Sequence, residues 1–215
     1  MNMTSYFRPI VRTGSPRSKK SIFLAETNYW ISEAEEIKFG ETAKLISIND
    51  VPDWWKKRWL KKRSDILGME FSSPKLMGIL NVTPDSFSDG GKHFKLDAAL
   101  NQAKFMEENG ADIIDVGGES TRPGALTIPI LEEIKRIEPV IKGIAARSKI
   151  PISIDTRKSE VASAARRAGA SMVNDVSGFT FDPNLLFYCS KYKLPVCVMH
   201  MQGSPENMQN DPKYE

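Results

Sequence analysis

From residue 76 onward, short hydrophobic runs alternate with longer stretches in which hydrophobic residues recur every three or four positions. The runs are rich in Ile and Val and mostly lack an alternating polar residue, which is typical of strands buried on both faces. They cover 76–80, 112–117, 151–156, 171–176 and 194–200. Helical spacing fills 97–110, 130–144, 159–169 and about 183–191. We therefore predict a parallel sheet whose strands are joined by helical crossovers.

Polar residues mark the carboxyl ends of these predicted strands. An open doubly wound sheet and a (β/α)8 TIM barrel both fit the alternation, and both bind ligands at that edge. Each of the five strands ends in or near a polar residue: Asn81, Asp115, Asp155, Asn174 and His200. Because five consecutive strands contribute to one rim, we predict an α/β TIM barrel. Residues 71–215 supply about five of its eight strand–helix units, so we expect the chain to be part of a longer protein.

Residues 1–70 differ in character from residues 71–215, and we predict a domain boundary between them. The first region holds 13 Lys and Arg against 9 Asp and Glu, together with all four tryptophans, whereas the second holds 17 and 18. The sequence RPIVRTGSPRSKK near the start is predicted to be flexible. KLISIND, residues 44–50, is expected to form an edge strand or hairpin over the bottom of the barrel.

The sequence VPDWWKKRWLKKR, residues 51–63, predicts a helix that begins at Pro52. Helical spacing places Val51, Trp55 and Trp59 on one face. A basic helix with tryptophans could bind a membrane surface or nucleic acid. Docking of the tryptophan face on the barrel or on a partner subunit is the interpretation we favour, because the run is short and isolated.

Hydropathy and cysteine content point to a cytoplasmic protein. No hydrophobic run approaches the length of a membrane span, and the first residues lack the apolar core of a secretory signal. The two cysteines, Cys189 and Cys197, lie in or beside hydrophobic segments, and we expect both to be reduced core residues.

Oxygen-bearing side chains dominate NVTPDSFSDGG, residues 81–91, which follows the first predicted strand. Asn81 and the hydroxyl and carboxylate groups after it suit a hard cation such as Mg2+, which binds through few protein oxygens together with phosphate oxygens and water. The loop is therefore a candidate site for a metal–phosphate group. A solvated turn stabilised by its own Asp and Ser side chains is the alternative.

A second loop, GGESTRPGA at 117–125, follows the next strand and combines glycines with Ser120, Thr121, Arg122 and Pro123. Arg122 could bind an anion or pair with Asp89 of the first loop. We expect the two loops to close over a substrate. The alternative is a surface arginine on a rigid turn.

Asp115, Asp155 and Asn174 should project from neighbouring strands into one cavity. Carboxylate and amide groups side by side match the hydrogen-bonding edge of a flat heterocycle such as an aminopyrimidine. For Asp155, capping of a helix is the alternative. Met199 and His200 end the last predicted strand, and we assign His200 no acid–base role.

These motifs resemble dihydropteroate synthases of the folate pathway. The resemblance rests on NVTPDSFSDGG, DVGGESTRPGA, ISIDT, VNDVSG and VCVMHMQG in this order, and it covers about residues 76–215. It implies a TIM barrel that condenses 7,8-dihydropterin (6-hydroxymethyl) pyrophosphate with 4-aminobenzoate, with Mg2+ present. By the same resemblance Asn81 binds the metal. The implied catalytic residues are Asp89, Arg122 and Asp115; the implied substrate-binding residues are Phe87, Ser120, Thr121, Pro123, Asp155, Asn174 and Met199.

The resemblance also implies which partners the protein has and that this chain alone lacks part of the active site. We expect a cytoplasmic homodimer that sulfonamides target, with small-molecule substrates and neither nucleic acid nor membrane as partners. Family motifs that supply cationic pyrophosphate contacts have no counterpart in this chain, so we expect the chain by itself not to catalyse. Two alternatives stay open: a pterin-binding barrel that transfers methyl groups to a corrinoid protein, and a catalytically inactive pterin-binding homologue that serves as a scaffold or partner subunit.

Overall fold

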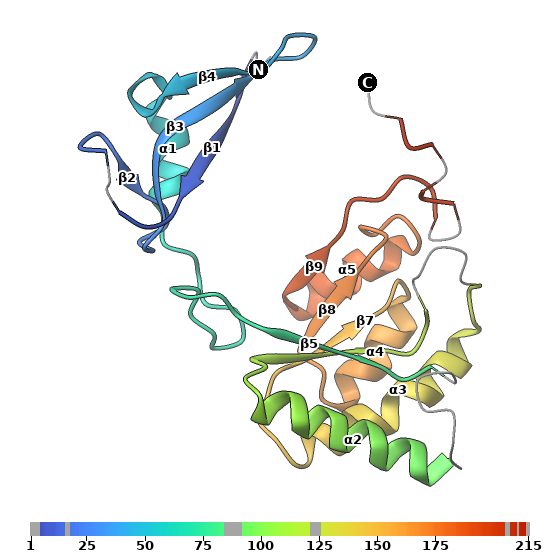
Figure 1. Ribbon diagram of the computed structural model, residues 1–215. Helices are drawn as coiled ribbons and strands as arrows, with labels where there is room; N and C mark the ends of the chain where they lie inside the picture. Colours follow the sequence, from blue (N-terminus) through green and yellow to red (C-terminus); the bar gives the residue numbers. More distant parts are fainter. Residues whose placement is uncertain are drawn as a thin grey trace. The chain divides into compact units, whose positions relative to one another are not determined.

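A computed structural model describes residues 5–15, 18–83, 92–120, 126–204, 207–209 and 211–213 (Figure 1). Its backbone forms two compact units, residues 1–74 and 75–215. The sequence placed the domain boundary at residues 70/71. Among the described residues, no helix is long and apolar enough to cross a membrane.

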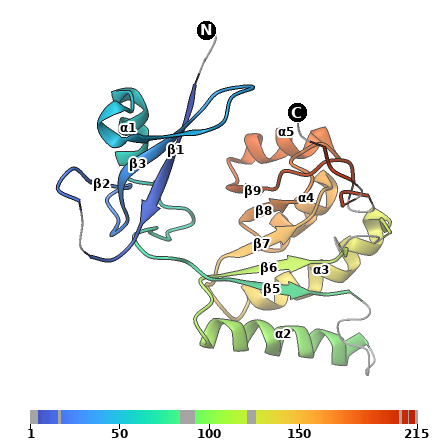
Figure 2. The same cartoon turned by 45° about the horizontal axis from the view of Figure 1, so that its top comes forward.

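The second unit is built on a parallel sheet with the strand order β5-β6-β7-β8-β9. The strands are β5 (Met77–Asn81), β6 (Ile113–Gly117), β7 (Ile152–Asp155), β8 (Met172–Asp175) and β9 (Val196–Val198). The helices between them are α2 (Lys92–Glu108), α3 (Ile130–Ala145), α4 (Ser159–Ala168) and α5 (Pro183–Tyr192). Figure 2 shows all four helices along one side of the sheet. The strand order and the helical crossovers confirm the predicted partial TIM barrel.

Hydrophobic side chains on the helix-facing side of the sheet form the core of this unit. Alternate strand positions carry them, and all are at most 2 % exposed: Leu80, Ile114, Val116, Ile152, Ile154 and Val173. They pack against buried residues of the helices, including Leu100, Ile137, Ile141, Val161 and Leu185. Because side chains alternate between the faces of a strand, the intervening positions face away from the helices.

Local signals explain where most of these helices begin and end. Asp182 caps α5 by accepting a hydrogen bond from the backbone N–H of Asn184, and Pro183 occupies the first turn. Gly169 ends α4 with φ 126°, and a Cβ there would lie 2.7 Å from Cβ of Ala145. The predicted start of α2 at Asp97 is wrong, because the helix begins at Lys92 and Asp97 is an exposed residue within it.

The first unit is an antiparallel sheet covered by one short helix. Its elements are β1 (Tyr6–Arg12), β2 (Ile22–Phe23), β3 (Trp30–Ile37), β4 (Lys44–Ser47), a 3-10 turn η1 (Ile48–Asp50) and α1 (Asp53–Leu60). Strand β3 is central, with β1 on one edge and β2 and β4 on the other. The predicted flexibility near the start is wrong over 8–12, because these residues pair with β3. Residues 44–47 do form an edge strand.

The tryptophans of α1 pack within their own unit. Pro52 precedes the helix as its N-cap, and Trp55 and Trp59 lie against a buried cluster of the first unit: Ile31, Ala34, Ile48 and Val51. Docking of this face on the barrel or on a partner subunit stays a prediction, because the described contacts are those within the first unit. The sheet of the first unit covers part of it.

Candidate functional site

A row of polar residues crosses the face of the sheet that points away from the helices. Strand pairing aligns Asn81 with Gly117, Gly117 with Asp155, Asp155 with Asn174, and Asn174 with Cys197. The residues two positions earlier on the first four strands pair with one another in the same way and form a lower row: Ile79, Asp115, Ser153 and Met172. Side chains of both rows share one face because positions two apart on a strand point the same way. The site therefore derives from strand register.

Asp115 lies in the lower row and holds Asn174 of the upper row. The side chain of Asn174 donates a hydrogen bond from Nδ2 to Oδ2 of Asp115 at 2.9 Å. Asp115 is 3 % exposed, and burial raises the pKa of its carboxyl group. The contact uses an amide N–H of Asn174, so its carbonyl oxygen remains an acceptor for a ligand.

Asp155 ends β7 between Gly117 and Asn174. Burial, reinforced by the negative charges of Asp115 and other acidic neighbours, raises the pKa of Asp155 to about 7. Its Oδ1 atom and the Oδ1 atom of Asp115 are buried and have no hydrogen-bond partner among the described residues. Buried acceptors of this kind are costly unless a ligand with donor groups, or ordered water, satisfies them.

Gly117 leaves open space between two polar side chains. A Cβ atom at this position would lie 3.4 Å from Oδ1 of Asn81 and 3.5 Å from Oδ2 of Asp155. Asn81 ends β5 and is exposed. Gly117 has no side chain, so the amide oxygen of Asn81 on β5 and the carboxylate of Asp155 on β7 face the same gap above β6.

The structure brings four predicted site residues together, namely Asn81, Asp115, Asp155 and Asn174. Ser120 lies three residues beyond β6, and Met199 follows β9 with its backbone N–H bonded to the carbonyl oxygen of Asp175. The other candidates lie outside the described residues: Phe87, Asp89, Thr121, Arg122 and Pro123.

The two rows also contain residues that were not predicted as part of the site: Gly117, Ser153 and Cys197, together with the hydrophobic Ile79 and Met172. The spacing of Ser153 two residues before Asp155 could have revealed that both share a face. Both cysteines are free, and Cys189 is buried as expected, but Cys197 is exposed, so its predicted place in the core is wrong. Strand β9 is exposed along its length, which accounts for the difference.

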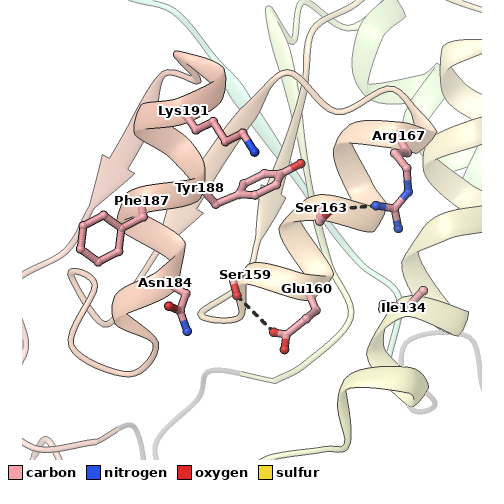
Figure 3. A pocket seen from close by; sticks show the side chains of 9 residues that line it. All are labelled: Ile134, Ser159, Glu160, Ser163, Arg167, Asn184, Phe187, Tyr188 and Lys191. Atoms are coloured by element: carbon pink, nitrogen blue, oxygen red, sulfur yellow. Dashed lines mark hydrogen bonds between the residues drawn. The ribbon is translucent and has the colours of Figure 1, made fainter.

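An open cavity of about 500 Å³ lies on the opposite side of the sheet, on the outer surface of α4 and α5 (Figure 3). Its polar side chains largely bond within their own helix: Ser159 donates to Glu160, and Arg167 donates to Ser163. None of the residues of the polar row lines it. The cavity is therefore separate from the candidate site.

Residues 77–215 match the sequence profile of a family described as pterin binding enzyme. The match spans more than half of the chain. The chain belongs to the pterin-binding enzyme family.

Individual family members give the same picture. The dihydropteroate synthase of Synechocystis sp. is 53 % identical over 135 residues, which are 63 % of this chain and 47 % of that protein. A crystal structure of the Yersinia pestis dihydropteroate synthase with a sulfonamide drug is similar with a TM-score of 0.62 and 49 % identity, covering 68 % of this chain and 53 % of that one. The Xanthomonas albilineans enzyme with 4-aminobenzoic acid gives a TM-score of 0.59 and 47 % identity, covering 62 % and 49 %. The chain spans about half the length of the relatives it matches.

The polar row lies within the part of the chain that matches the family. Residues 77–215 contain every strand that contributes to the row, whereas the antiparallel sheet of residues 5–47 lies outside the match.

Proposed function

We propose that the full-length protein is a dihydropteroate synthase. It would condense 7,8-dihydropterin (6-hydroxymethyl) pyrophosphate with 4-aminobenzoate to give dihydropteroate and pyrophosphate. The observation that carries this proposal is the row of Asp155 and Asn174 above Asp115, with two buried carboxylate oxygens that lack partners among the described residues. The similarity to dihydropteroate synthases supports the choice of reaction.

The pterin ring offers the donors that this site lacks. Its 2-amino-4-oxo edge carries a ring N–H next to an exocyclic amino group, and one carboxylate can accept both hydrogen bonds. Asp155 is the carboxylate we assign to that edge, and the carbonyl oxygen of Asn174 accepts from a further N–H. Binding would favour the ionised form of Asp155 and offset the cost of burying its charge.

The proposed reaction transfers the pterin methylene group from oxygen to nitrogen. The bond between the methylene carbon and the pyrophosphate oxygen breaks, and its electron pair leaves with pyrophosphate. The amino nitrogen of 4-aminobenzoate then bonds to the methylene carbon and releases one proton. The strand-borne groups hold the pterin so that its methylene carbon faces the rim, which makes attack effectively intramolecular.

Asn81 would hold Mg2+ in this scheme. Its exposed amide oxygen at the end of β5 is a hard ligand beside the gap at Gly117, and Mg2+ typically adds phosphate oxygens and water to one or two protein ligands. Among the described residues, no group of three His, Cys, Asp or Glu side chains could form a metal cage. Bound Mg2+ would neutralise charge on the departing pyrophosphate.

The residues of the two loops complete the proposal. We assign Phe87, Asp89, Arg122 and Pro123 to the 4-aminobenzoate site, with Asp89 and Arg122 as catalytic residues, and Thr121 to the substrate loop. Ser120 and Met199 are assigned to the rim of the same substrate site. These assignments rest on the motifs NVTPDSFSDGG and STRPG.

We further propose a cytoplasmic homodimer with small-molecule substrates. Free cysteines support a reducing compartment. The motif resemblance supports the dimer, and light scattering of the full-length protein checks it.

The decisive experiment measures both products with the full-length protein. Intact mass spectrometry establishes the length of the natural polypeptide. Chromatography then follows dihydropteroate and a coupled assay follows pyrophosphate, each with one substrate omitted as a control. We expect equal amounts of both products, dependent on both substrates and on Mg2+. Pterin binding without product would instead identify an inactive binding homologue.

A further inference from the structure

A buried threonine joins the end of β7 to the end of β8 and to helix α3. Thr156 directly follows Asp155 and is 2 % exposed. Its backbone N–H donates to the carbonyl oxygen of Asn174 at 3.0 Å, one position beyond the last paired residues of the two strands, Asp155 and Asn174. The two polar residues that we assign to the pterin are therefore linked through the backbone of Thr156.

The hydroxyl group of Thr156 fixes the threonine in turn. It donates to Oε1 of Glu133 at 2.7 Å and accepts the backbone N–H of Lys158 at 3.2 Å. A hydroxyl group has one donor, and here it is directed at a carboxylate, which forms stronger hydrogen bonds than a neutral acceptor. Both contacts are buried, so they are shielded from water.

Glu133 is held in place from several directions. It lies in the first turn of α3 and is fully buried. Its Oε2 atom pairs with the ammonium group of Lys158 at 2.7 Å, and Lys158 also binds Glu119 and the carbonyl oxygen of Ile128, which makes a buried cluster around Lys158. A Cβ atom at Gly118 would lie 3.2 Å from Cγ of Glu133, so a residue without a side chain makes room for it. The carboxylate of Glu133 is therefore a fixed acceptor between α3 and the end of β7.

Asp155 depends on this arrangement because few contacts hold its own side chain. Its Oδ1 atom is buried and has no hydrogen-bond partner among the described residues. The position of the carboxylate is therefore set mainly by the backbone at residues 155–156. A shift of this backbone would change the spacing between Asp155 and Asn174, which a pterin has to contact together.

Stability alone does not explain the buried carboxylate of Glu133. Burying the charges of Glu133 and Lys158 carries a large desolvation cost, and well-packed hydrophobic residues often stabilise a protein as well or better. Burial is the main cause of the raised pKa of Asp155, and the charge of Glu133 adds to it, which disfavours the ionised form that accepts hydrogen bonds from a pterin. A carboxylate with these two costs is better explained by the hydrogen bond that it provides to Thr156.

We infer that Thr156 and Glu133 are positioning residues for the pterin, which hold the end of β7 so that Asp155 and Asn174 face the heterocycle together. Neither positioning residue needs to contact the substrate. The inference rests on the proposed function, because it assumes the pterin site described there. It predicts that loss of the Thr156 hydroxyl group weakens pterin binding through Asp155.

Thr156 is the residue to change, because it is uncharged, whereas a substitution of Glu133 would alter both position and charge near Asp155. Thr156→Val replaces the hydroxyl group with a methyl group of similar size. We expect the affinity of the full-length protein for 7,8-dihydropterin (6-hydroxymethyl) pyrophosphate to fall roughly ten-fold, since small displacements of binding groups are costly. Calorimetry in the absence of 4-aminobenzoate measures the affinity, and circular dichroism checks that the variant is folded.

Thr27 of the first unit supplies a matched control. Its hydroxyl group donates to the carbonyl oxygen of Leu24 at 2.7 Å and accepts the backbone N–H of Tyr29 at 3.2 Å, so it bonds in the same pattern as that of Thr156. Thr27→Val should change pterin affinity less than about two-fold. Thr156→Ser keeps the hydroxyl group and should restore an affinity close to that of wild type.

A double-mutant cycle distinguishes positioning of Asp155 from general support of the fold. If Thr156 acts through Asp155, Thr156→Val should lower the affinity less than about three-fold in the Asp155→Asn background. A general loss of structure would lower it equally in both backgrounds. Thr156→Ala also lacks the hydroxyl group, and it takes the place of Thr156→Val in every arm of the test if that variant does not fold.

Three results would overturn the inference: an unchanged pterin affinity in folded Thr156→Val, an equal loss in Thr156→Ser, or the same loss in the Asp155→Asn background. Each can occur while wild-type protein binds pterin and forms dihydropteroate, so the proposed function would stand. Wild-type protein that binds pterin without forming dihydropteroate overturns the proposed reaction and leaves the inference intact. Wild-type protein that does not bind pterin overturns both.

Discussion

Asp155 experiences opposing influences from the protein and from a ligand. Burial and the neighbouring acidic groups favour its neutral form, so its pKa is about 7 in the folded chain against an ordinary value of 3.8. Donor groups of a bound heterocycle would favour the charged form. The residue is thus destabilising to the free protein and useful to the complex, as is common for functional groups.

This opposition predicts the pH dependence of stability. The unfolded chain releases the Asp155 proton near pH 4 and the folded chain near pH 7, so the free energy of unfolding should fall as the pH rises between these values. Asp155→Asn removes the effect. We expect this variant to be more stable than wild type by on the order of 2 kcal/mol at pH 8, after discounting for partial exposure, and nearly equal at pH 4. Urea denaturation of the full-length protein at both pH values measures this.

Asp182→Asn is the matched control for that prediction. Backbone N–H groups of Ser159 and Asn184 bind Asp182 and lower its pKa despite the opposing effect of partial burial. Its stabilising contribution is therefore present at neutral pH and disappears as the pH falls below 4. The control should lose stability at pH 8, which is the opposite sign. Four acidic groups raise the pKa of Asp155, namely Asp115, Glu133, Asp175 and Glu119. A loss of stability in Asp155→Asn at pH 8 would contradict the predicted cost of burying the charge of Asp155 beside them.

Asn174→Ala tests the predicted role of Asn174 and Asp115 in pterin binding. The variant leaves Oδ2 of Asp115 buried without its donor and removes one acceptor from the site. We expect pterin affinity to fall at least roughly ten-fold, equivalent to a loss of about 1.4 kcal/mol. Calorimetry with a pterin ligand measures the change. Cys197→Ala, which alters the neighbouring position of the row, should change the affinity less than Asn174→Ala. A larger effect of Cys197→Ala would indicate that the heterocycle binds nearer to β9.

At the level of elements, sequence periodicity predicted the second unit well. Hydrophobic runs and their spacing correctly predicted helix α4 and the five strands, because each strand packs against helices that follow it closely in the chain. Pro139 lies inside α3, yet the isoleucine spacing identified that helix correctly. The start of α2 was missed because Asp97 resembles a capping residue but lies on an exposed helical surface.

The first unit was harder to predict because its contacts are distant in sequence. Strand β1 contains a proline and two arginines, which suggest a flexible segment when read locally. Its stability depends on pairing with β3, where Arg12 forms an ion pair with Glu33 and Arg8 with Glu35. The buried cluster around Lys158 was missed for the same reason, since its members come from three separate segments.

Trp59 is the residue that best tests the packing of α1. Truncation to alanine removes contacts with the buried cluster of the first unit and should cost that unit about 2 to 3 kcal/mol, less than a fully buried tryptophan. Hydrogen exchange of the full-length protein should show faster exchange in β1 and β3 and unchanged exchange in β6 and β7. Trp54, 46 % exposed, supplies the control. Equal effects of Trp59→Ala and Trp54→Ala would show that the packing contributes little.

At the scale of the whole molecule, the division of the chain into two units predicts that the second unit binds pterin without the first. All described residues of the polar row lie within 75–215. Removal of residues 1–70 from the full-length protein should therefore leave pterin affinity within about two-fold of wild type, as expected for independent sites. Calorimetry measures the affinity, and circular dichroism checks that the barrel remains folded. A folded variant that no longer binds pterin would show that the first unit completes the site.

The origin of the site in strand register has an evolutionary consequence. A substitution changes one member of the row, but inserting or deleting a single residue within β7 would turn Asp155 toward the helices and bring a hydrophobic neighbour to the pocket. Lineages of this protein can therefore vary in loop length and helix surface while strand lengths before the row stay constant. Insertions and deletions among related proteins should fall outside these strands.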